Sequence, residues 1–277
     1  MPQVKTMKWN FSQGVRTGCS HEKQGLPCQD MVKAAYSRQD MEDAVYAAAL
    51  ADGAGSASHS TEGARKTVEF ICGWIKKHFD ETYSALEAGE KDKTAEKIKK
   101  SLHRALKKTA RRNGVSGIDS LACTMMFAAA SNGRYITGHI GDGIIATLAG
   151  NNNSGQSSSG NTAGEQADTM LFSAPQNGKY INETFFVTDP LMDRLIELKH
   201  GSISAENIKA FALMSDGISD AVWKRTDGNF VNSFTSLLKY ATENPLMAGK
   251  EIANLLEKAT DVATDDDCSL IIMSAQQ

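Results

Sequence analysis

Hydrophobic and polar residues alternate along this chain in two kinds of pattern. Short apolar runs bounded by glycine or polar residues are typical of β-strands, whereas apolar residues three or four positions apart predict a helix. The short runs predict strands at residues 9–15, 31–36, 44–51, 121–130, 135–148, 183–188, 208–214 and 269–274. The helical spacing predicts helices at residues 60–83, 92–112, 190–199, 229–242 and 245–259.

The order of these elements distinguishes between the classes of mixed fold. Strands follow one another without an intervening helix at the start and in the middle of the chain, which favours antiparallel pairing. Helices gathered in blocks favour an α+β fold over a doubly wound α/β fold. We therefore expect one α+β domain over residues 1–277.

Residues 150–166 differ from the rest of the chain because almost all of them are glycine, asparagine, serine, glutamine or threonine. Such a segment cannot bury enough apolar surface to offset the cost of ordering it, so a flexible loop is predicted. The loop follows Asp142 closely in sequence. We expect it near the rim of any site there, either as a flap that influences substrate choice or as an inserted surface loop.

Composition and charge exclude several classes of protein. The chain has 277 residues, of which 41% are hydrophobic and 23% charged, as in an ordinary globular protein. A net charge of −3 gives no general attraction to nucleic acid or to an anionic membrane. The longest apolar stretch, residues 44–51, is far shorter than the roughly 20 residues of a membrane helix, and residues 1–14 lack the apolar part of a secretion signal. We expect a cytoplasmic protein that binds neither nucleic acid nor membrane.

The five cysteines do not form a recognisable framework. They are scattered and odd in number, which argues against a set of disulfides in a chain of this length. Cys19, His21 and Cys28 lack the second pair of ligands that a structural zinc site requires.

The helix expected at residues 92–112 is strongly basic. Ile98 and Leu102 lie on its apolar face, and lysine or arginine covers much of the rest. A solvated outer face is the interpretation that the pattern favours, and a docking surface is the alternative.

Four aspartates stand at the ends of predicted strands. Asp52, Asp142 and Asp216 each follow an apolar run and are each followed by glycine, and Asp266 lies just before the last strand. Glycine lets the backbone turn sharply, so this pattern presents carboxylates at the end of a rigid sheet. Carboxylate oxygens are ligands that Mg²⁺ and Mn²⁺ prefer. The pattern predicts a site that binds several metal ions and transfers phosphoryl groups.

Aspartate followed by glycine is also the preferred two-residue turn of a β-hairpin. Asp142 fits this interpretation best, because residues 144–148 can pair with the preceding strand. Asp52 fits it less well, because a loop of small residues and then a helix follow. Asp227, which glycine also follows, has no apolar strand before it and is interpreted as part of a loop.

Short motifs that contain these acids follow one another over residues 16–271. In chain order they are Gly18–Asp30, Asp52–Gly55, Gly141–Gly143, Asp216–Asp220 and Asp265–Ser269. This series resembles the metal-dependent Ser/Thr protein phosphatases of the PP2C (PPM) family. The match is closest to the bacterial branch, whose first motif carries a histidine and ends in Gln-Asp. Each motif alone is weak, but five in the family's order are specific.

The resemblance implies a fold of two antiparallel β-sheets packed face to face as a β-sandwich, with helices on both outer faces. It also implies an enzyme that hydrolyses phosphoserine and phosphothreonine in proteins with water activated at a binuclear Mg²⁺ or Mn²⁺ centre. The substrate would be a phosphorylated signalling protein, such as a partner Ser/Thr kinase. Clustered acids repel one another without metal, so the activity should depend on the ions.

The resemblance also assigns the metal ligands. They are Asp30, Asp52, Gly53, Asp142, Asp216, Asp220 and Asp266. Asp52 would bridge two ions with help from the carbonyl of Gly53, and Asp216 and Asp266 would bind the first ion. Asp30 would act near the second ion, partly through water. Asp142 and Asp220 would form a third, weaker metal position.

The chain departs from the family's pattern at three positions. Many members bind the substrate phosphate with an arginine near the first motif, where His21 stands here and Arg16 is the other candidate. Ala54 stands where eukaryotic members have a histidine that is assigned as a general acid. Water or another group must therefore protonate the leaving group here, and His59 is a candidate that lies near in sequence. Gln29 replaces a frequent glutamate. These losses leave a second hypothesis, a phosphatase-like regulatory or binding module with little catalysis.

Overall fold

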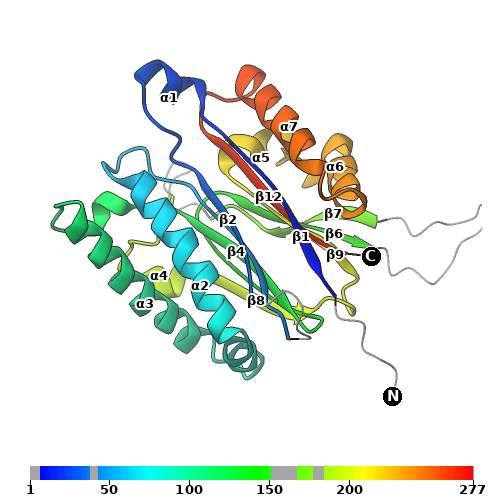
Figure 1. The fold of residues 1–277 in the computed structure, drawn as a ribbon, viewed down its shortest axis with the longest axis horizontal. Coiled ribbons are helices and arrows are strands. Elements are labelled where there is room, and N and C mark those ends of the chain that lie inside the picture. The colour runs from blue at the N-terminus through cyan, green and yellow to red at the C-terminus, as the bar shows by residue number, and fades with distance from the viewer. Residues whose placement is uncertain (1–6, 38–42, 151–166, 177–183, 277) are drawn as a thin grey trace, which may run out of the picture.

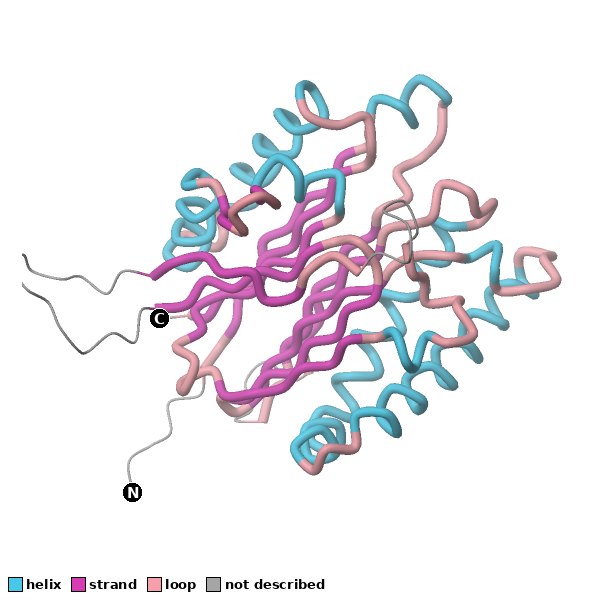
Figure 2. Tube along the Cα trace, turned by 180° about the vertical axis from the view of Figure 1, so that it is seen from behind, coloured by secondary structure: helices cyan, strands magenta, loops and turns pink. Residues whose placement is uncertain are grey.

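The protein is represented by a computed structural model that describes residues 7–37, 43–150, 167–176 and 184–276. Two five-stranded β-sheets lie face to face in its centre, and helices cover the outer face of each sheet (Figures 1 and 2). This arrangement of helix, sheet, sheet and helix confirms the predicted α+β sandwich. None of the helices described is long and apolar enough to cross a membrane.

All neighbouring strands of the two large sheets pair antiparallel. The first sheet has the order β1, β12, β9, β6 and β7, with bounds Trp9–Arg16, Cys268–Ala275, Ile208–Met214, Ile144–Gly150 and Ala167–Ser173. The second sheet has the order β2, β3, β4, β5 and β8, with bounds Met31–Tyr36, Tyr46–Ala51, Met125–Ser131, Arg134–Ile140 and Glu197–Ser202. A separate pair of short strands is formed by β10 and β11, at Trp223–Lys224 and Asn229–Phe230.

The helices form two outer layers. Those over the second sheet are α2, α3 and α4, at Ser60–Glu87, Lys91–Arg112 and Met192–Leu195. Those over the first sheet are α5, α6 and α7, at Asp216–Val222, Asn232–Glu243 and Ala248–Val262. Two further short helices are α1 and the 3-10 helix η1, at Cys19–Gln24 and Asp119–Leu121.

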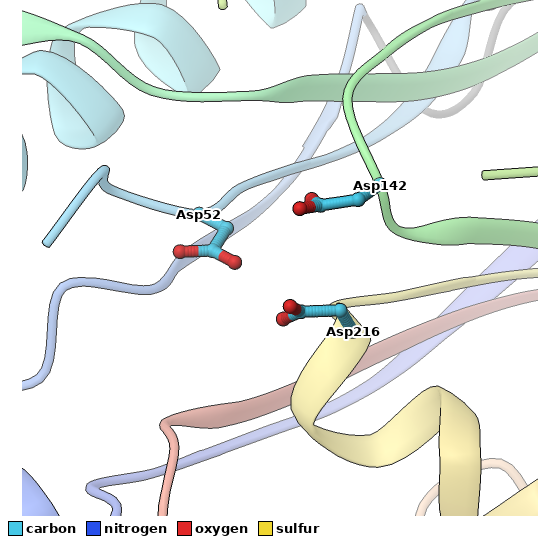
Figure 3. Close-up of side chains that lie close together, drawn as sticks. All are labelled: Asp52, Asp142 and Asp216. Atoms are coloured by element: carbon cyan, nitrogen blue, oxygen red, sulfur yellow. The ribbon is translucent and has the colours of Figure 1, made fainter. Parts of the chain in front are cut away.

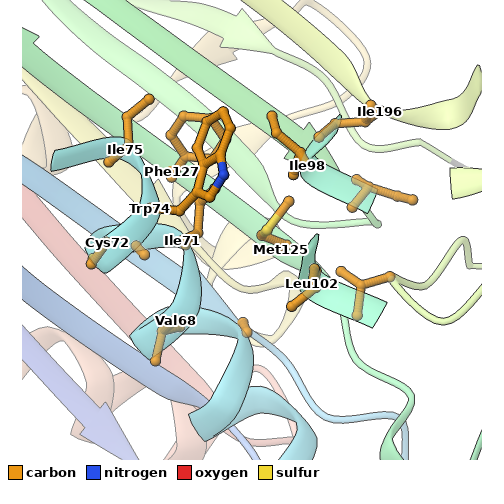
Figure 4. Packing of buried hydrophobic residues seen from close by; sticks show 14 of the residues in the cluster. Val68, Ile71, Cys72, Trp74, Ile75, Ile98, Leu102, Met125, Phe127 and Ile196 are labelled. Carbon is orange, nitrogen blue, oxygen red and sulfur yellow. The ribbon is translucent and has the colours of Figure 1, made fainter. Parts of the chain in front are cut away.

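The central strands are apolar on both faces because each face meets a packed layer. In β4, Met125 and Phe127 belong to the core under α2 and α3 (Figure 4), and Met126 belongs to the core between the sheets. In β12, Ile272 faces the helices of the other outer layer and Ile271 faces the opposite sheet. Burial of each such side chain stabilises the fold by roughly 1.5–3 kcal/mol. A slip of one residue would move every side chain to the wrong core, so the packing fixes the strand register.

Most of the predicted elements are confirmed, with ends that differ by a few residues. The last helix is an instructive difference, because α7 begins at Ala248 and not at Pro245. Asn244 ends α6, and its carbonyl accepts hydrogen bonds from the backbone N–H groups of Met247 and Ala248. The helix predicted to start at residue 229 starts at Asn232, because the preceding residues form β11.

The helix predicted over residues 190–199 is confirmed only over Met192–Leu195. Only α4 is helical there, and the chain then forms β8, which pairs with the edge of β5. His200 and Gly201, predicted to stop the helix, lie inside β8 opposite Ile136 and Tyr135. The edge strand of the sheet offers backbone partners that outweigh the local helical pattern.

The strand predicted at residues 183–188 is also wrong over its described part. Residues 184–188 belong to neither large sheet. The backbone N–H of Val187 donates to the Cys123 carbonyl at 2.9 Å, and the Val187 carbonyl contacts the His103 ring at 2.7 Å. Single contacts to a loop and to α3 therefore replace a strand ladder.

The single strand predicted over residues 135–148 divides into β5 and β6, which belong to different sheets. The hairpin interpretation of Asp142 is therefore wrong, because β6 pairs with β7 and β9. Gly141 has φ +128°, a conformation that favours glycine, and a Cβ atom there would clash with Thr124. The chain crosses from one sheet to the other at this glycine.

The loop predicted at residues 150–166 lies outside the described residues except for Gly150, so its flexibility stays a prediction. The expectation that it lies near Asp142 also stays a prediction. β6 starts just after Asp142 and ends at Gly150, which pairs with Ala167 of β7. A strand of this length spans roughly 20 Å, so the described residues that flank the loop, Gly150 and Ala167, lie at the other end of β6 from Asp142.

Candidate active site

Three of the aspartates that precede glycine meet at one end of the two sheets. Asp52 follows β3 of the second sheet, Asp216 follows β9 of the first sheet, and Asp142 lies where the chain crosses between the sheets. Each carboxylate has an oxygen within 4.8 Å of an oxygen of the other two. Figure 3 shows the three side chains pointing toward one another. Both sheets therefore contribute to this cluster.

The cluster lies in a cleft of about 430 Å³. The other described residues of its wall are Ser20, His21, Gln29, Gly53, Ala54, Gly55, Thr124, Thr184, Phe186, Asp265 and Asp266. Its size is within the range of small-molecule sites, but such sites are usually lined by apolar side chains. Here only Ala54 and Phe186 bring apolar side chains to the described wall, so the cleft suits a charged ligand.

Asp30 directly precedes β2 and is 1% exposed. Burial raises its pKa to about 7, and the negative charges of Asp267 and Asp216 contribute to this rise. A buried carboxylate is costly unless it is neutralised by a proton or paired with a cation.

The clustered acids raise the pKa values of one another. Burial raises the pKa of Asp52 well above its usual range, and repulsion by Asp30, Asp216, Asp142 and Asp266 adds to the effect. Burial, followed by repulsion from Asp142 and Asp266, raises the pKa of Asp216 to about 6. Protons or cations are therefore needed to hold this group of acids together near neutral pH.

The unsatisfied oxygens indicate which cation fits. Buried carboxylate oxygens of Asp30, Asp142 and Asp216 have no hydrogen-bond partner among the described residues. Divalent cations with oxygen ligands, such as Mg²⁺ and Mn²⁺, would satisfy several of these oxygens at once. The cluster offers no sulfur or imidazole ligand, which argues against a zinc or copper site. The residues present thus fit the ions that the sequence predicts.

Asp267, which the sequence pattern did not distinguish from its neighbours, organises the first motif. It is 3% exposed, and its carboxylate accepts hydrogen bonds from the backbone N–H groups of Gly18 at 2.8 Å and Gln29 at 2.6 Å. The same carboxylate contacts His21 Nδ1 at 2.9 Å. One side chain at the start of β12 therefore holds the segment that leads to Asp30.

The structure favours His21 over Arg16 as the contact for a phosphate. His21 lies on the cleft wall, and because its Nδ1 is bound to Asp267, a contact to phosphate has to use Nε2. Arg16 is not among the described wall residues and lies 3.8 Å from Glu257 of α7.

The remaining predicted residues divide into two groups. Gly53 and Asp266 lie on the cleft wall with the three clustered acids. Asp220 does not join them, because its side chain is 67% exposed and forms an ion pair with Arg225 at 3.1 Å. Thr184, which the sequence did not indicate, donates a hydrogen bond to Asp142.

The positions that depart from the family's pattern have structural explanations. The side-chain oxygen of Gln29 accepts a hydrogen bond from Ser60 at 2.9 Å, so it fixes the first turn of α2. His59 lies just before α2, where its backbone N–H donates to the Ser120 carbonyl, and it is absent from the described wall. His21 is therefore the one histidine on the part of the wall that the structure describes.

A sandwich of two antiparallel sheets with a carboxylate cluster at their shared end defines a protein whose site suits divalent cations and a charged ligand. The family model described as protein phosphatase 2C matches residues 17–257. Serine/threonine-protein phosphatase 3 from Escherichia coli (strain K12) is 25% identical over 272 residues, which cover 96% of this chain and 98% of that protein.

Solved structures show the same fold. The serine/threonine phosphatase Stp1 from Staphylococcus aureus has a TM-score of 0.60 and 14% identity, with 100% of this chain and 98% of that chain covered. The catalytic domain of the serine threonine protein phosphatase PstP, in complex with two manganese ions, has a TM-score of 0.57 and 13% identity, with 98% and 100% covered. This chain belongs to the protein phosphatase 2C family. The family and the enzyme class that the motifs predicted are confirmed.

Proposed function

We propose that this protein removes phosphate from phosphoserine and phosphothreonine in proteins, in one domain and with two Mg²⁺ or Mn²⁺ ions. The observation that carries this proposal is the meeting of Asp52, Asp142 and Asp216 in a polar cleft. The names of the relatives, serine/threonine phosphatases, and the two manganese ions of one of them support it. A phosphorylated signalling protein, such as a Ser/Thr kinase, is the proposed substrate.

The residues that would hold the ions are Asp30, Asp52, Gly53, Asp142, Asp216 and Asp266. When bound, such ions lower the pKa of water and offset the negative charge that develops on the phosphoryl oxygens. Asp142 would serve a third, weaker position. Asp220 is left out of this set because its carboxylate is paired with Arg225.

Other residues would bind and orient the substrate. His21, held by Asp267, would donate from Nε2 to a phosphoryl oxygen. No other histidine lies on the described wall, and Ala54 carries no proton to give. We therefore propose that water in the cleft protonates the serine or threonine oxygen as its bond to phosphorus breaks.

Hydrolysis of p-nitrophenyl phosphate with and without Mn²⁺ tests the proposed chemistry. Turnover should appear with Mn²⁺ and vanish with excess chelator. Asp52→Asn should lower kcat/KM by at least about 100-fold, because this residue faces two other ligand carboxylates. Asp227→Asn is a matched control, because Asp227 also precedes glycine but is exposed in the turn between β10 and β11. Activity that survives chelation, or an Asp52→Asn enzyme as active as the control, would overturn the proposal.

Calorimetric titration with Mn²⁺ separates this function from the alternative of a regulatory module. The module hypothesis expects tight binding of two ions with no hydrolysis of any phosphopeptide. We favour the enzyme because the loss of catalysis would first remove metal carboxylates, and those predicted for the two ions lie at or beside the cleft.

A further inference from the structure

The helix α3 carries its positive charges in two different ways. In its first half, Lys93, Lys97, Lys99 and Lys100 each form an ion pair with a neighbouring carboxylate. Its second half contains five exposed cations that form no ion pair in the part of the chain that the structure describes. These five, called the basic face below, are Arg104, Lys107, Lys108, Arg111 and Arg112.

The basic face is a single continuous surface. Its members stand at positions 104, 107, 108, 111 and 112, and this helical spacing places them within an arc of roughly 140° around the helix. Leu102, Leu106 and Ala110 are buried on the opposite side of the helix. The whole chain has a net charge of −3, so this surface is a local reversal of sign.

The stability of the helix does not explain the basic face. Like charges at i and i+4, such as Arg104 and Lys108, destabilise a helix by roughly 0.2–0.5 kcal/mol per pair. The dipole at the end of the helix favours Arg111 and Arg112, but its effect falls off within the last turn. Arg104, Lys107 and Lys108 lie earlier, so the arrangement costs stability without a compensating ion pair among the described residues.

The basic face lies at the end of the molecule that holds the cleft. α3 runs antiparallel to α2, so its last turn lies toward the start of α2 (Figure 1). The chain then continues to η1, where the Ser120 carbonyl accepts a hydrogen bond from His59 and the Ala122 carbonyl accepts one from Ala54. Ala54 is part of the cleft wall.

A second connection runs from the middle of α3 to the cleft. His103, next to the first member of the basic face, contacts the Val187 carbonyl at 2.7 Å. Phe186, the residue before Val187, lies on the cleft wall. The basic face is thus joined to the wall through two short segments.

We propose that the basic face binds an aspartate- and glutamate-rich segment of the phosphoprotein substrate while the phosphorylated residue occupies the cleft. This inference rests on the proposed phosphatase function. Charge complementarity carries it, because the five cations are exposed with no carboxylate between them. From Arg112 to Ser120 the chain reaches at most roughly 28 Å, which about eight extended substrate residues also span.

Two variants of the same helix test this docking surface. The basic-face variant carries Lys107→Gln, Lys108→Gln and Arg111→Gln, and the control carries Lys93→Gln, Lys97→Gln and Lys100→Gln. Both remove three charges from exposed positions of α3, and glutamine has a helix propensity close to that of lysine and arginine. Circular dichroism and thermal melts verify that both variants fold.

The substrates are phosphothreonine peptides of equal length with an acidic block before the phosphothreonine, an acidic block after it, or neutral residues throughout. In the basic-face variant, kcat/KM for the preferred acidic peptide should fall about tenfold through KM, since three exposed charge contacts are lost. Turnover of the neutral peptide and of p-nitrophenyl phosphate should stay within twofold, and the control variant should match wild type. The preference should weaken at high salt. Equal losses on acidic and neutral peptides, or equal losses in the control, would refute the proposal.

Fluorescence anisotropy of an unphosphorylated acidic peptide gives a readout that needs no turnover. The protein could prove inactive on every phosphopeptide and still bind the acidic peptide. If only the basic-face variant then loses this binding, the docking surface is supported although the phosphatase function fails. An active enzyme whose peptide binding and peptide preference do not change leaves the function intact and overturns the docking surface. Binding of a 20-base-pair DNA duplex or of phosphatidylserine vesicles to the basic face, without binding of the acidic peptide, also overturns it.

Discussion

Asp267 shows how one buried side chain can position residues that are far away in the sequence. Its carboxylate receives hydrogen bonds from two backbone N–H groups and contacts His21, all within the segment before Asp30. Removal of a partner from a buried donor costs the full desolvation of that donor, which exceeds the value of the bond itself. Asp267 therefore supports both the substrate contact and the buried acid beside it.

We predict that Asp267→Ala lowers the free energy of unfolding by about 3 kcal/mol, because two backbone donors lose a charged acceptor. Asp267→Asn keeps one acceptor oxygen and should lose roughly half as much. Urea unfolding measures both changes. Asp261→Ala, at an exposed position of α7, is the control, and an equal effect in that variant would contradict the role given to Asp267.

At the scale of single residues, the sequence predicted the type of side chain better than the direction in which the side chain points. The run Asp265-Asp266-Asp267 was recognised as a ligand motif, but only Asp266 was selected from it. Asp266 and Asp265 lie on the cleft wall, whereas Asp267 faces inward. All three acids precede β12 and the backbone bends at Asp265 and Asp266, so the direction of each side chain depends on loop geometry that the sequence pattern does not indicate.

At the scale of elements, the ends of strands hold acids whose protonation is linked to folding. The pKa of Asp30 is raised to about 7 and that of Asp216 to about 6, whereas an unfolded aspartate has a pKa of about 4. In the metal-free protein the folded state therefore binds more protons than the unfolded state between these values. Its free energy of unfolding should fall as pH rises from 5 to 8.

We predict that Asp30→Asn removes part of this dependence, because asparagine does not titrate. In chelator, the difference in unfolding free energy between pH 5 and pH 8 should be smaller in the variant, on the order of a few kcal/mol. Urea unfolding at both pH values measures it, and added Mn²⁺ should stabilise wild type more at pH 8 than at pH 5. Parallel profiles of the variant and wild type would show that Asp30 titrates normally.

Long elements were predicted well and short ones poorly. α2 and α3 contain several helical turns, so their apolar spacing is unambiguous. α1 has 6 residues and α5 has 7, too few for a periodic signal, and neither was predicted as a helix. The sequence left a hairpin open as an alternative at Asp142, where the chain crosses between the sheets, because a glycine and a polar residue between two apolar runs fit either geometry.

At the scale of the whole molecule, a buried polar chain joins the two sheets. His139 of β5 lies 2.7 Å from the Ser173 hydroxyl of β7, which also contacts Glu197 of β8, and Glu197 pairs with Lys199. Burial lowers the pKa of His139 to about 4. An unfolded histidine has a pKa of about 6.5, so the unfolded state binds more protons between these two values. Protonation of this histidine should therefore destabilise the fold as pH falls from 6.5 to 4.

We predict that His139→Gln reduces the loss of stability on acidification. The unfolding free energy of wild type should fall by a few kcal/mol more than that of the variant between pH 7 and pH 4.5. Thermal or urea unfolding at both pH values measures the difference. His200→Gln is the control, because His200 lies half-buried on β8 beside Tyr83. An equal effect of both substitutions would contradict this account.

The layered architecture was expected from the order of elements and from the family resemblance, but the strand order was not. β1 and β12, which open and close the chain, are neighbours in the first sheet, with Trp9 opposite Ala275. Such a pairing depends on contacts between residues far apart in the chain, and local patterns carry no information about it.

The division of the acid cluster between two sheets gives the central core a second role. Asp52 extends from one sheet and Asp216 from the other, so the span between them depends on the thickness of the layer that separates the sheets. Alanines such as Ala48 and Ala128 keep part of that layer thin. Mg²⁺ requires shorter and more regular bonds than larger cations do. Larger side chains at these positions should move Asp52 away from Asp216, so buried residues that lie outside the cleft control the distance across which an ion would have to be held.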